Sequence, residues 1–162
     1  MKIPAHVINI EIDQVYLPTS IKPAIQRAAS EALPLLAADQ QIELTILICD
    51  DEYMQELNLT YRGQDKTTDV LSFEGRFEVP GSEMTYMGDI AISYPTALKQ
   101  ASRLGHALEA EISLLTVHGI LHLFGHDHQD EAEKQEMWSI QAKIMESIGF
   151  SNITILTDDS SA

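Results

Sequence analysis

Basic residues and cysteine are both scarce in this sequence. Only 10 lysines and arginines stand against 25 aspartates and glutamates, which gives a formal net charge of −15 at pH 7. Such a charge disfavours broad electrostatic attraction to a polyanion, so a nucleic-acid partner would have to meet a local basic patch or a bound cation. The single cysteine, Cys49, excludes an intrachain disulfide and fits a reducing compartment. We expect it to pack as a small apolar residue at the end of a strand.

Long apolar runs are absent as well. No run approaches the ~20 residues that a membrane helix requires, and Pro4, His6 and Glu11 interrupt the first residues, so no signal-peptide core forms. These absences favour a soluble, cytoplasmic protein with no membrane partner. With 162 residues, 44% of them hydrophobic, the chain is long enough to bury one core. We expect one metallohydrolase domain over residues 1–150 and a polar, partly disordered tail over residues 151–162.

The spacing of apolar residues predicts an α+β fold. Strands are expected near 6–12, 42–49, 69–73 and 88–93, and helices near 20–33, 51–62, 94–104, 106–124 and 130–148. Residues 74–87 contain two glycines and a proline, and we interpret them as a mobile loop, a hairpin connection rather than a lid. The helix over 106–124 is apolar on more than one face, which is typical of a helix buried in the middle of a domain. The expected architecture is a small mixed sheet of about four strands packed around this central metal-bearing helix, with additional helices.

The stretch TVHGILHLFGHDH, from Thr116 to His128, holds four of the six histidines. His118 and His122 are four residues apart on the predicted helix, so both imidazoles project from one face, as in helical zinc sites. Gly125 lets the chain leave the helix and reverse, which brings His128 back as a third ligand. Three protein ligands leave a fourth position open, and that arrangement is typical of catalytic zinc. The pattern predicts one Zn²⁺ ion on these three histidines.

Other interpretations of this cluster stay open. Histidines with this spacing are often ordinary core or surface residues, and a structural zinc site would need a fourth ligand, for which His126 is the local candidate. The register also matches the metzincin pattern H-E-x-x-H-x-x-G-x-x-H, which keeps a zincin-type metallopeptidase as an alternative function. However, Gly119 stands where those proteases have their general-base glutamate. The sequence therefore has the three histidines of the metzincin pattern but lacks the glutamate that serves as the general base of those peptidases.

A second group of residues places cations in an otherwise acidic chain. Arg62 and Lys66 are candidates for binding substrate, because an arginine beside an open zinc position can bind a phosphate bidentately. Arg62 can equally be an ordinary cation at a helix end. Asp89 and Asp127 are candidates for a general base, and the alternative role for Asp127 is to orient a metal ligand.

Three motifs in order, YRGQDKTTDVLSF, GDIAIS and HGILHLFGHDH, resemble the YbeY family of bacterial endoribonucleases. The resemblance implies a zinc-dependent endoribonuclease that prefers single strands and acts in maturation of the small-subunit (16S) ribosomal RNA 3′ end and in ribosome quality control. It implies His118, His122 and His128 as zinc ligands at the catalytic centre and Arg62 as the functional arginine. It also implies ribosomal RNA, small-subunit ribosomal proteins and a ribosome-associated GTPase as partners. His126 stands where the family often has tyrosine, and a non-enzymatic, zinc-stabilised ribosome-binding module remains an alternative.

Overall fold

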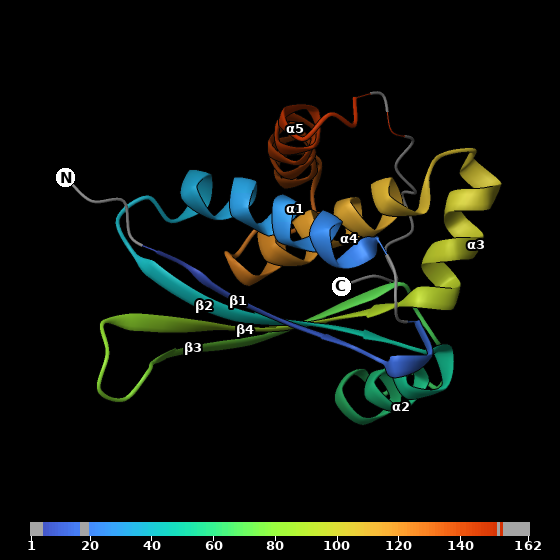
Figure 1. Ribbon diagram of the computed structural model, residues 1–162, viewed down its shortest axis with the longest axis horizontal. Helices are drawn as coiled ribbons and strands as arrows, with labels where there is room; N and C mark the ends of the chain where they lie inside the picture. Colours follow the sequence, from blue (N-terminus) through green and yellow to red (C-terminus); the bar gives the residue numbers. More distant parts are fainter. Residues whose placement is uncertain (1–4, 17–19, 152, 154–162) are drawn as a thin grey trace.

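The computed structural model describes residues 5–16, 20–151 and 153, so most of the expected tail over 151–162 lies outside the described residues. Within the described ranges, strands and helices follow one another up to Arg62, then come two consecutive strands, and the last three elements are helices (Figure 1). The elements are β1 (Val7–Ile12), the short 3-10 helix η1 (Gln14–Tyr16), α1 (Ile21–Leu36), β2 (Gln41–Cys49), α2 (Asp51–Arg62), β3 (Val70–Glu78), β4 (Met84–Ser93), α3 (Tyr94–Leu104), α4 (Leu108–Leu123) and α5 (Glu131–Ser147).

The strands form one mixed sheet in the order β1-β2-β4-β3. β1 pairs with β2 and β2 with β4 in parallel, whereas β3 is antiparallel to β4. Parallel neighbours need a crossover connection, and α1 provides it between β1 and β2. Every second residue of β2 is fully buried, namely Ile42, Leu44, Ile46 and Ile48, because a strand turns alternate side chains to one face. The expected α+β class with a small mixed sheet is confirmed.

Helices α1 and α4 lie across one face of the sheet, with α5 beyond them, while α2 packs on the opposite face at one end (Figure 1). Twelve of the sixteen residues of α4 are buried, so this helix is surrounded by α1, α3, α5 and the sheet. A helix that is apolar on all sides occupies such a central place. Any functional side chain that α4 carries is therefore held by packing on several sides.

Gly119 on α4 packs directly against the sheet. A Cβ atom at this position would lie 2.8 Å from Ile90 Cγ2 and 3.2 Å from Ser72 Oγ. The Ser72 hydroxyl also donates a hydrogen bond to the Gly119 carbonyl at 3.0 Å, which ties α4 to β3. Since interiors are close-packed, a larger residue at 119 would force the helix away from the sheet.

The prediction of a mobile loop over residues 74–87 is wrong, because most of these residues belong to strands. β3 continues to Glu78 and β4 begins at Met84, so residues 79–83 make the whole connection of a hairpin. The rings of Phe77 and Tyr86 stack across the two strands with centroids 5.2 Å apart, and such cross-strand pairs stabilise a hairpin. Gly75 lies beside an irregularity of the strand pairing rather than in a turn.

The helix boundaries follow the capping residues. Asp50 and Asp130 each accept a hydrogen bond of 2.8 Å from the backbone amide three residues on, at the starts of α2 and α5. α4 begins at Leu108, slightly later than expected, and the His106 ring before it contacts the buried Glu111 carboxylate at 2.6 Å. Among the described helices, none combines the length and apolar composition needed to cross a membrane.

Candidate metal centre

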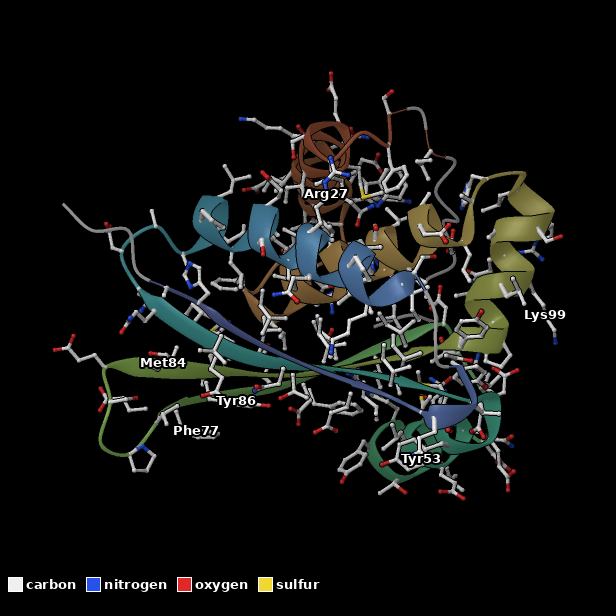
Figure 2. The ribbon with its side chains drawn as sticks, viewed as in Figure 1. Arg27, Tyr53, Phe77, Met84, Tyr86 and Lys99 are labelled. Atoms are coloured by element: carbon white, nitrogen blue, oxygen red, sulfur yellow. The ribbon has the colours of Figure 1, made fainter. Side chains whose placement is uncertain are left out.

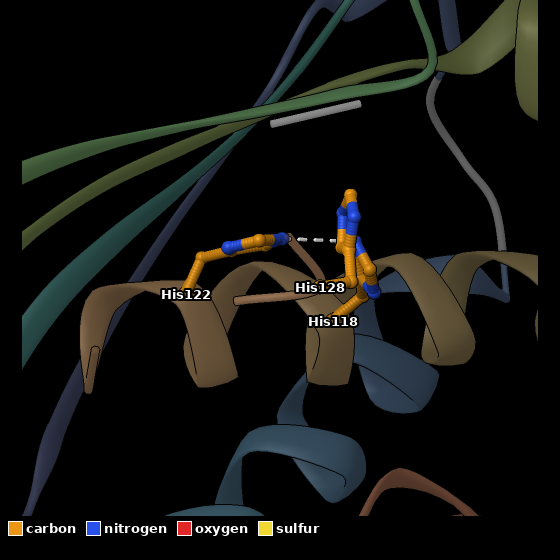
Figure 3. Close-up of side chains that lie close together, drawn as sticks. All are labelled: His118, His122 and His128. Atoms are coloured by element: carbon orange, nitrogen blue, oxygen red, sulfur yellow. Dashed lines mark hydrogen bonds between the residues drawn. The ribbon is translucent and has the colours of Figure 1, made fainter. Parts of the chain in front are cut away.

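The last two turns of α4 present two imidazoles side by side. His118 and His122 are separated by four residues, which on a helix places them one turn apart on the same face. Their rings have centroids 4.6 Å apart, and the two Nε2 atoms lie 3.1 Å from each other (Figure 3). Two ring nitrogens at this distance can both coordinate one cation.

The chain reversal after α4 returns a third imidazole to the same place. Gly125 adopts φ of +90°, a conformation that favours glycine, and the next amide, of His126, donates to the Leu121 carbonyl at 3.0 Å. The Asp127 carboxylate then accepts a hydrogen bond from the His128 backbone amide at 2.7 Å, which orders the turn. The His128 ring lies 5.3 Å from the His122 ring and 5.8 Å from the His118 ring, centroid to centroid.

The three converging imidazoles fit a metal ion. One ligand atom from each of His118, His122 and His128 lies within 4.8 Å of the others, so the group could hold a single cation. Burial is the main cause that lowers the pKa of His122. A lowered pKa keeps the ring neutral near pH 7, and the neutral imidazole is the form that binds metal. A donor set of three imidazoles suits zinc among the common ions.

A cavity of about 790 Å³ adjoins the histidines. His122 and His128 line it on one side, and the end of α2 and the edge strand β3 contribute Tyr61, Arg62 and Phe73. This volume lies within the range of roughly 300–1,000 Å³ that is usual for small-molecule sites. An extended polymer chain could pass along the sheet edge, because β3 has no further strand beside it in the described sheet.

Arg62 reaches this cavity from the last residue of α2. Gly63, with φ of +69°, ends the helix in the left-handed conformation and lets the chain turn away directly behind the arginine. One guanidinium nitrogen of Arg62 donates to the Ser72 carbonyl at 2.8 Å, and the guanidinium carbon lies 6.0 Å from the centroid of the Phe73 ring. These contacts orient the cation beside the histidines.

The other polar residues that the sequence suggested for the site do not all lie at the cavity. Lys66 is exposed and lies outside the cavity lining, and its carbonyl accepts a hydrogen bond of 2.9 Å from the buried Asn58. Asp127 and His126 line the cavity. Tyr86 lies on the side of the sheet away from α1 (Figure 2), and its hydroxyl donates a hydrogen bond to the exposed Asp89. This position does not support Asp89 as the general base.

Sequence reasoning missed one residue that contacts the histidines. Gln141 of α5 is fully buried, and its side-chain oxygen lies 3.0 Å from His118 Nδ1. In sequence it stands among the apolar residues Met137, Ile144 and Met145, which are also buried. A polar residue at a core position was the available signal, since buried polar groups need partners.

The α+β domain, the three converging imidazoles and the adjoining cavity are together typical of a mononuclear metallohydrolase. A family model described as "Endoribonuclease YbeY" matches residues 7–149. The chain belongs to this family.

Curated relatives agree with this assignment, and a solved structure agrees with the fold. The endoribonuclease YbeY of Bacillus cereus is 37% identical, over 88% of this chain and 98% of the relative. The endoribonuclease YbeY of Pelotomaculum thermopropionicum is 38% identical, over 93% of this chain and 99% of the relative. A solution structure from Thermotoga maritima has a TM-score of 0.61 and 24% identity, over 88% of this chain and 89% of that one, and so shares the fold.

Proposed function

We propose that this protein is a zinc-dependent endoribonuclease that cleaves single-stranded ribosomal RNA, at the 3′ end of the small-subunit RNA and in ribosome quality control. Family membership supports the reaction class. The observation that carries the proposal for this chain is the convergence of His118, His122 and His128 beside a cavity that Arg62 also lines. Three imidazoles leave a coordination position for substrate, and the arginine adds a partner for phosphate.

The roles of the side chains follow from their positions. A zinc ion on the three imidazoles would supply Lewis acidity toward a phosphate oxygen and activate water for hydrolysis. Arg62, oriented by the Ser72 carbonyl, binds the scissile phosphate and stabilises the negative charge that builds on its oxygens. Asp127 holds the turn that delivers His128, through the hydrogen bond to the His128 amide. Lys66 would bind phosphates further along the strand, from its exposed position outside the cavity.

A zincin-type peptidase is disfavoured by the surroundings of Gly119. In those proteases a glutamate at the equivalent position is the general base. Here even a Cβ atom would meet Ile90 at 2.8 Å, so the position has no room for a glutamate side chain. The cavity is lined by two of the three proposed metal ligands, His122 and His128, and by Arg62, a combination that suits a phosphate better than a peptide.

The acidic surface suggests how the RNA is delivered. With 25 acidic and 10 basic residues, the chain has little long-range attraction for free RNA. Small-subunit ribosomal proteins and a ribosome-associated GTPase, the partners that the family resemblance implies, would bring the substrate to the enzyme. Weak affinity for free RNA would also limit cleavage of other transcripts.

The proposed function predicts a specific pattern of hydrolysis by the zinc-loaded protein. We expect cleavage of an end-labelled single-stranded RNA, weaker cleavage of the same sequence in a duplex, and no hydrolysis of casein. A chelator should abolish RNA cleavage and added zinc should restore it, because the imidazoles alone provide no Lewis acid. Gel analysis of the RNA and dye release from casein measure both activities. Casein hydrolysis, or RNA cleavage that persists in chelator, would contradict the proposal.

Tyr61 supports the preference for single strands. Its side chain is 64% exposed at the cavity and its ring packs edge-on against Phe73, with centroids 5.2 Å apart. Bases stack on exposed aromatic rings at roughly 1–3 kcal/mol per base, and only unpaired bases are available for such stacking. We therefore expect Tyr61→Ala to raise KM for single-stranded RNA about tenfold with little change in kcat.

Two variants control for this effect in steady-state kinetics. Tyr61→Phe keeps the ring and should retain most of the wild-type KM. Tyr53→Ala removes an exposed tyrosine of the same helix that lies outside the cavity lining, and should leave KM unchanged (Figure 2). An equal rise in KM for the two alanine variants would rule out a stacking role that is particular to Tyr61.

A further inference from the structure

Gln141 is a buried polar residue that no proposed chemical step uses. It is fully buried on α5, and its side-chain Oε1 lies 3.0 Å from Nδ1 of His118. Its Nε2 is also buried and has no hydrogen-bond partner among the described residues. A buried amide group without a hydrogen-bond partner lowers the free energy of unfolding, so a glutamine at this position destabilises the fold unless another interaction of its side chain offsets the loss. The contact with His118 provides one.

The contact determines which nitrogen of His118 carries the proton. An amide oxygen only accepts hydrogen bonds, so the nitrogen facing it, Nδ1, carries the hydrogen. In a neutral ring the other nitrogen, Nε2, then presents its lone pair. That atom lies 3.1 Å from His122 Nε2, inside the group of atoms that could hold a metal. The hydrogen bond therefore leaves His118 in the form that binds an ion.

The reversed orientation of the amide would have the opposite effect. The NH₂ group of Gln141 would then donate to Nδ1 and place the ring proton on Nε2, where it would point at His122 and exclude a cation. A carboxylate at 141 would also accept a hydrogen bond from His118, but it would be a buried negative charge without a neighbouring cation whenever the ion is absent. A glutamine provides the acceptor without that charge.

We propose that Gln141 is a positioning residue whose side-chain oxygen holds His118 in the Nδ1-protonated tautomer and so presents Nε2 to the metal. This inference rests on the proposed metal function of the three histidines. It assigns to α5 a part in the site, although α5 contributes none of the proposed ligands. Ligand histidines commonly donate their second N–H to such a partner, and loss of the partner typically weakens metal affinity by roughly 10–100-fold.

Two substitutions at 141 and one control separate this role from packing. Gln141→Met keeps the length of the side chain and removes the acceptor, and we expect it to weaken zinc binding by about 10–100-fold. Gln141→Glu retains an acceptor and should bind zinc within a few-fold of wild type or more tightly. Met145→Leu alters a buried apolar residue one turn along α5 and should leave zinc affinity unchanged. Affinity is measured by competition with a chromophoric chelator on chelator-stripped protein whose folding is checked by circular dichroism.

A second readout does not depend on bound zinc. Long-range ¹⁵N–¹H NMR spectra of the stripped wild-type protein should show His118 protonated on Nδ1, and Gln141→Met should lose that preference. Equal zinc affinity in Gln141→Met and wild type, an equal loss in the methionine and glutamate variants, or protonation on Nε2 in the wild type would overturn the inference. If the wild type binds no zinc while His118 keeps the Nδ1 proton, the proposed metal function fails and the tautomer assignment stands.

Discussion

His122→Ala is expected to lose bound zinc and RNA cleavage together. Removing it leaves two imidazoles of the three whose nitrogens lie within 4.8 Å of one another. Loss of an outer partner of a metal ligand already costs roughly 10–100-fold in affinity or activity, so loss of a ligand itself should exceed about 100-fold in both. Metal content by atomic absorption and cleavage of single-stranded RNA under single-turnover conditions measure the two losses.

His126→Ala is the matched control for this prediction. His126 lines the same cavity but does not belong to the group of three that could hold a metal. We expect this variant to retain one zinc per chain, which would also exclude the structural site with four protein ligands. RNA cleavage at the wild-type rate by metal-free His122→Ala would refute the zinc mechanism.

The arrangement of the candidate metal centre was largely predictable because it depends on local geometry. On a helix, the four-residue spacing of His118 and His122 places both side chains on the same face. The apolar residues around them indicated both the helix and its burial. A glycine with positive φ is a common way to end a helix, so Gly125 indicated the reversal that returns His128. These inferences needed only residues close in sequence.

The position of Asp89 required knowledge of the faces of the sheet. Ile90 and Ile92 of β4 are buried and face the helices, so the period of two turns Asp89 to the opposite side. The alternation was readable from the sequence. However, only the packed structure shows that α4 and its histidines lie on the isoleucine side.

Two other features depended on contacts between distant segments. The hairpin of β3 and β4 extends through residues whose glycines suggested a loop, because pairs such as Phe77 and Tyr86 outweigh the local preference. The contact of Gln141 with His118 joins residues 23 positions apart on different helices. Which residue of α5 contacts His118 depends on how α5 packs on α4, and helical periodicity alone does not determine that packing.

Arg62→Ala is expected to lower kcat for RNA cleavage by about 10²–10³-fold while zinc binding is retained. Removing one donor to a charged transition state typically costs this factor, about 2.7–4 kcal/mol. Arg62 is anchored to the Ser72 carbonyl and lines the cavity next to His122, but it is a cation and cannot ligate the metal. Arg62→Lys should recover part of the activity, since a lysine keeps the charge and loses the bidentate geometry. Single-turnover rates and metal content separate the two effects.

The same variant distinguishes the two interpretations of Arg62 that its sequence context leaves open. An arginine in the last turn of a helix stabilises that helix through its carbonyls and dipole, typically by about 0.3–1 kcal/mol. Arg103 also stands in the last turn of its helix, α3, two residues before Gly105 in the left-handed conformation, and it lies outside the cavity lining. If Arg62 were only such a cation, Arg62→Ala and Arg103→Ala would lower the melting temperature by similar small amounts and neither would change kcat. We expect similar small losses of stability in both and a loss of kcat in Arg62→Ala alone, because only Arg62 stands beside the three imidazoles.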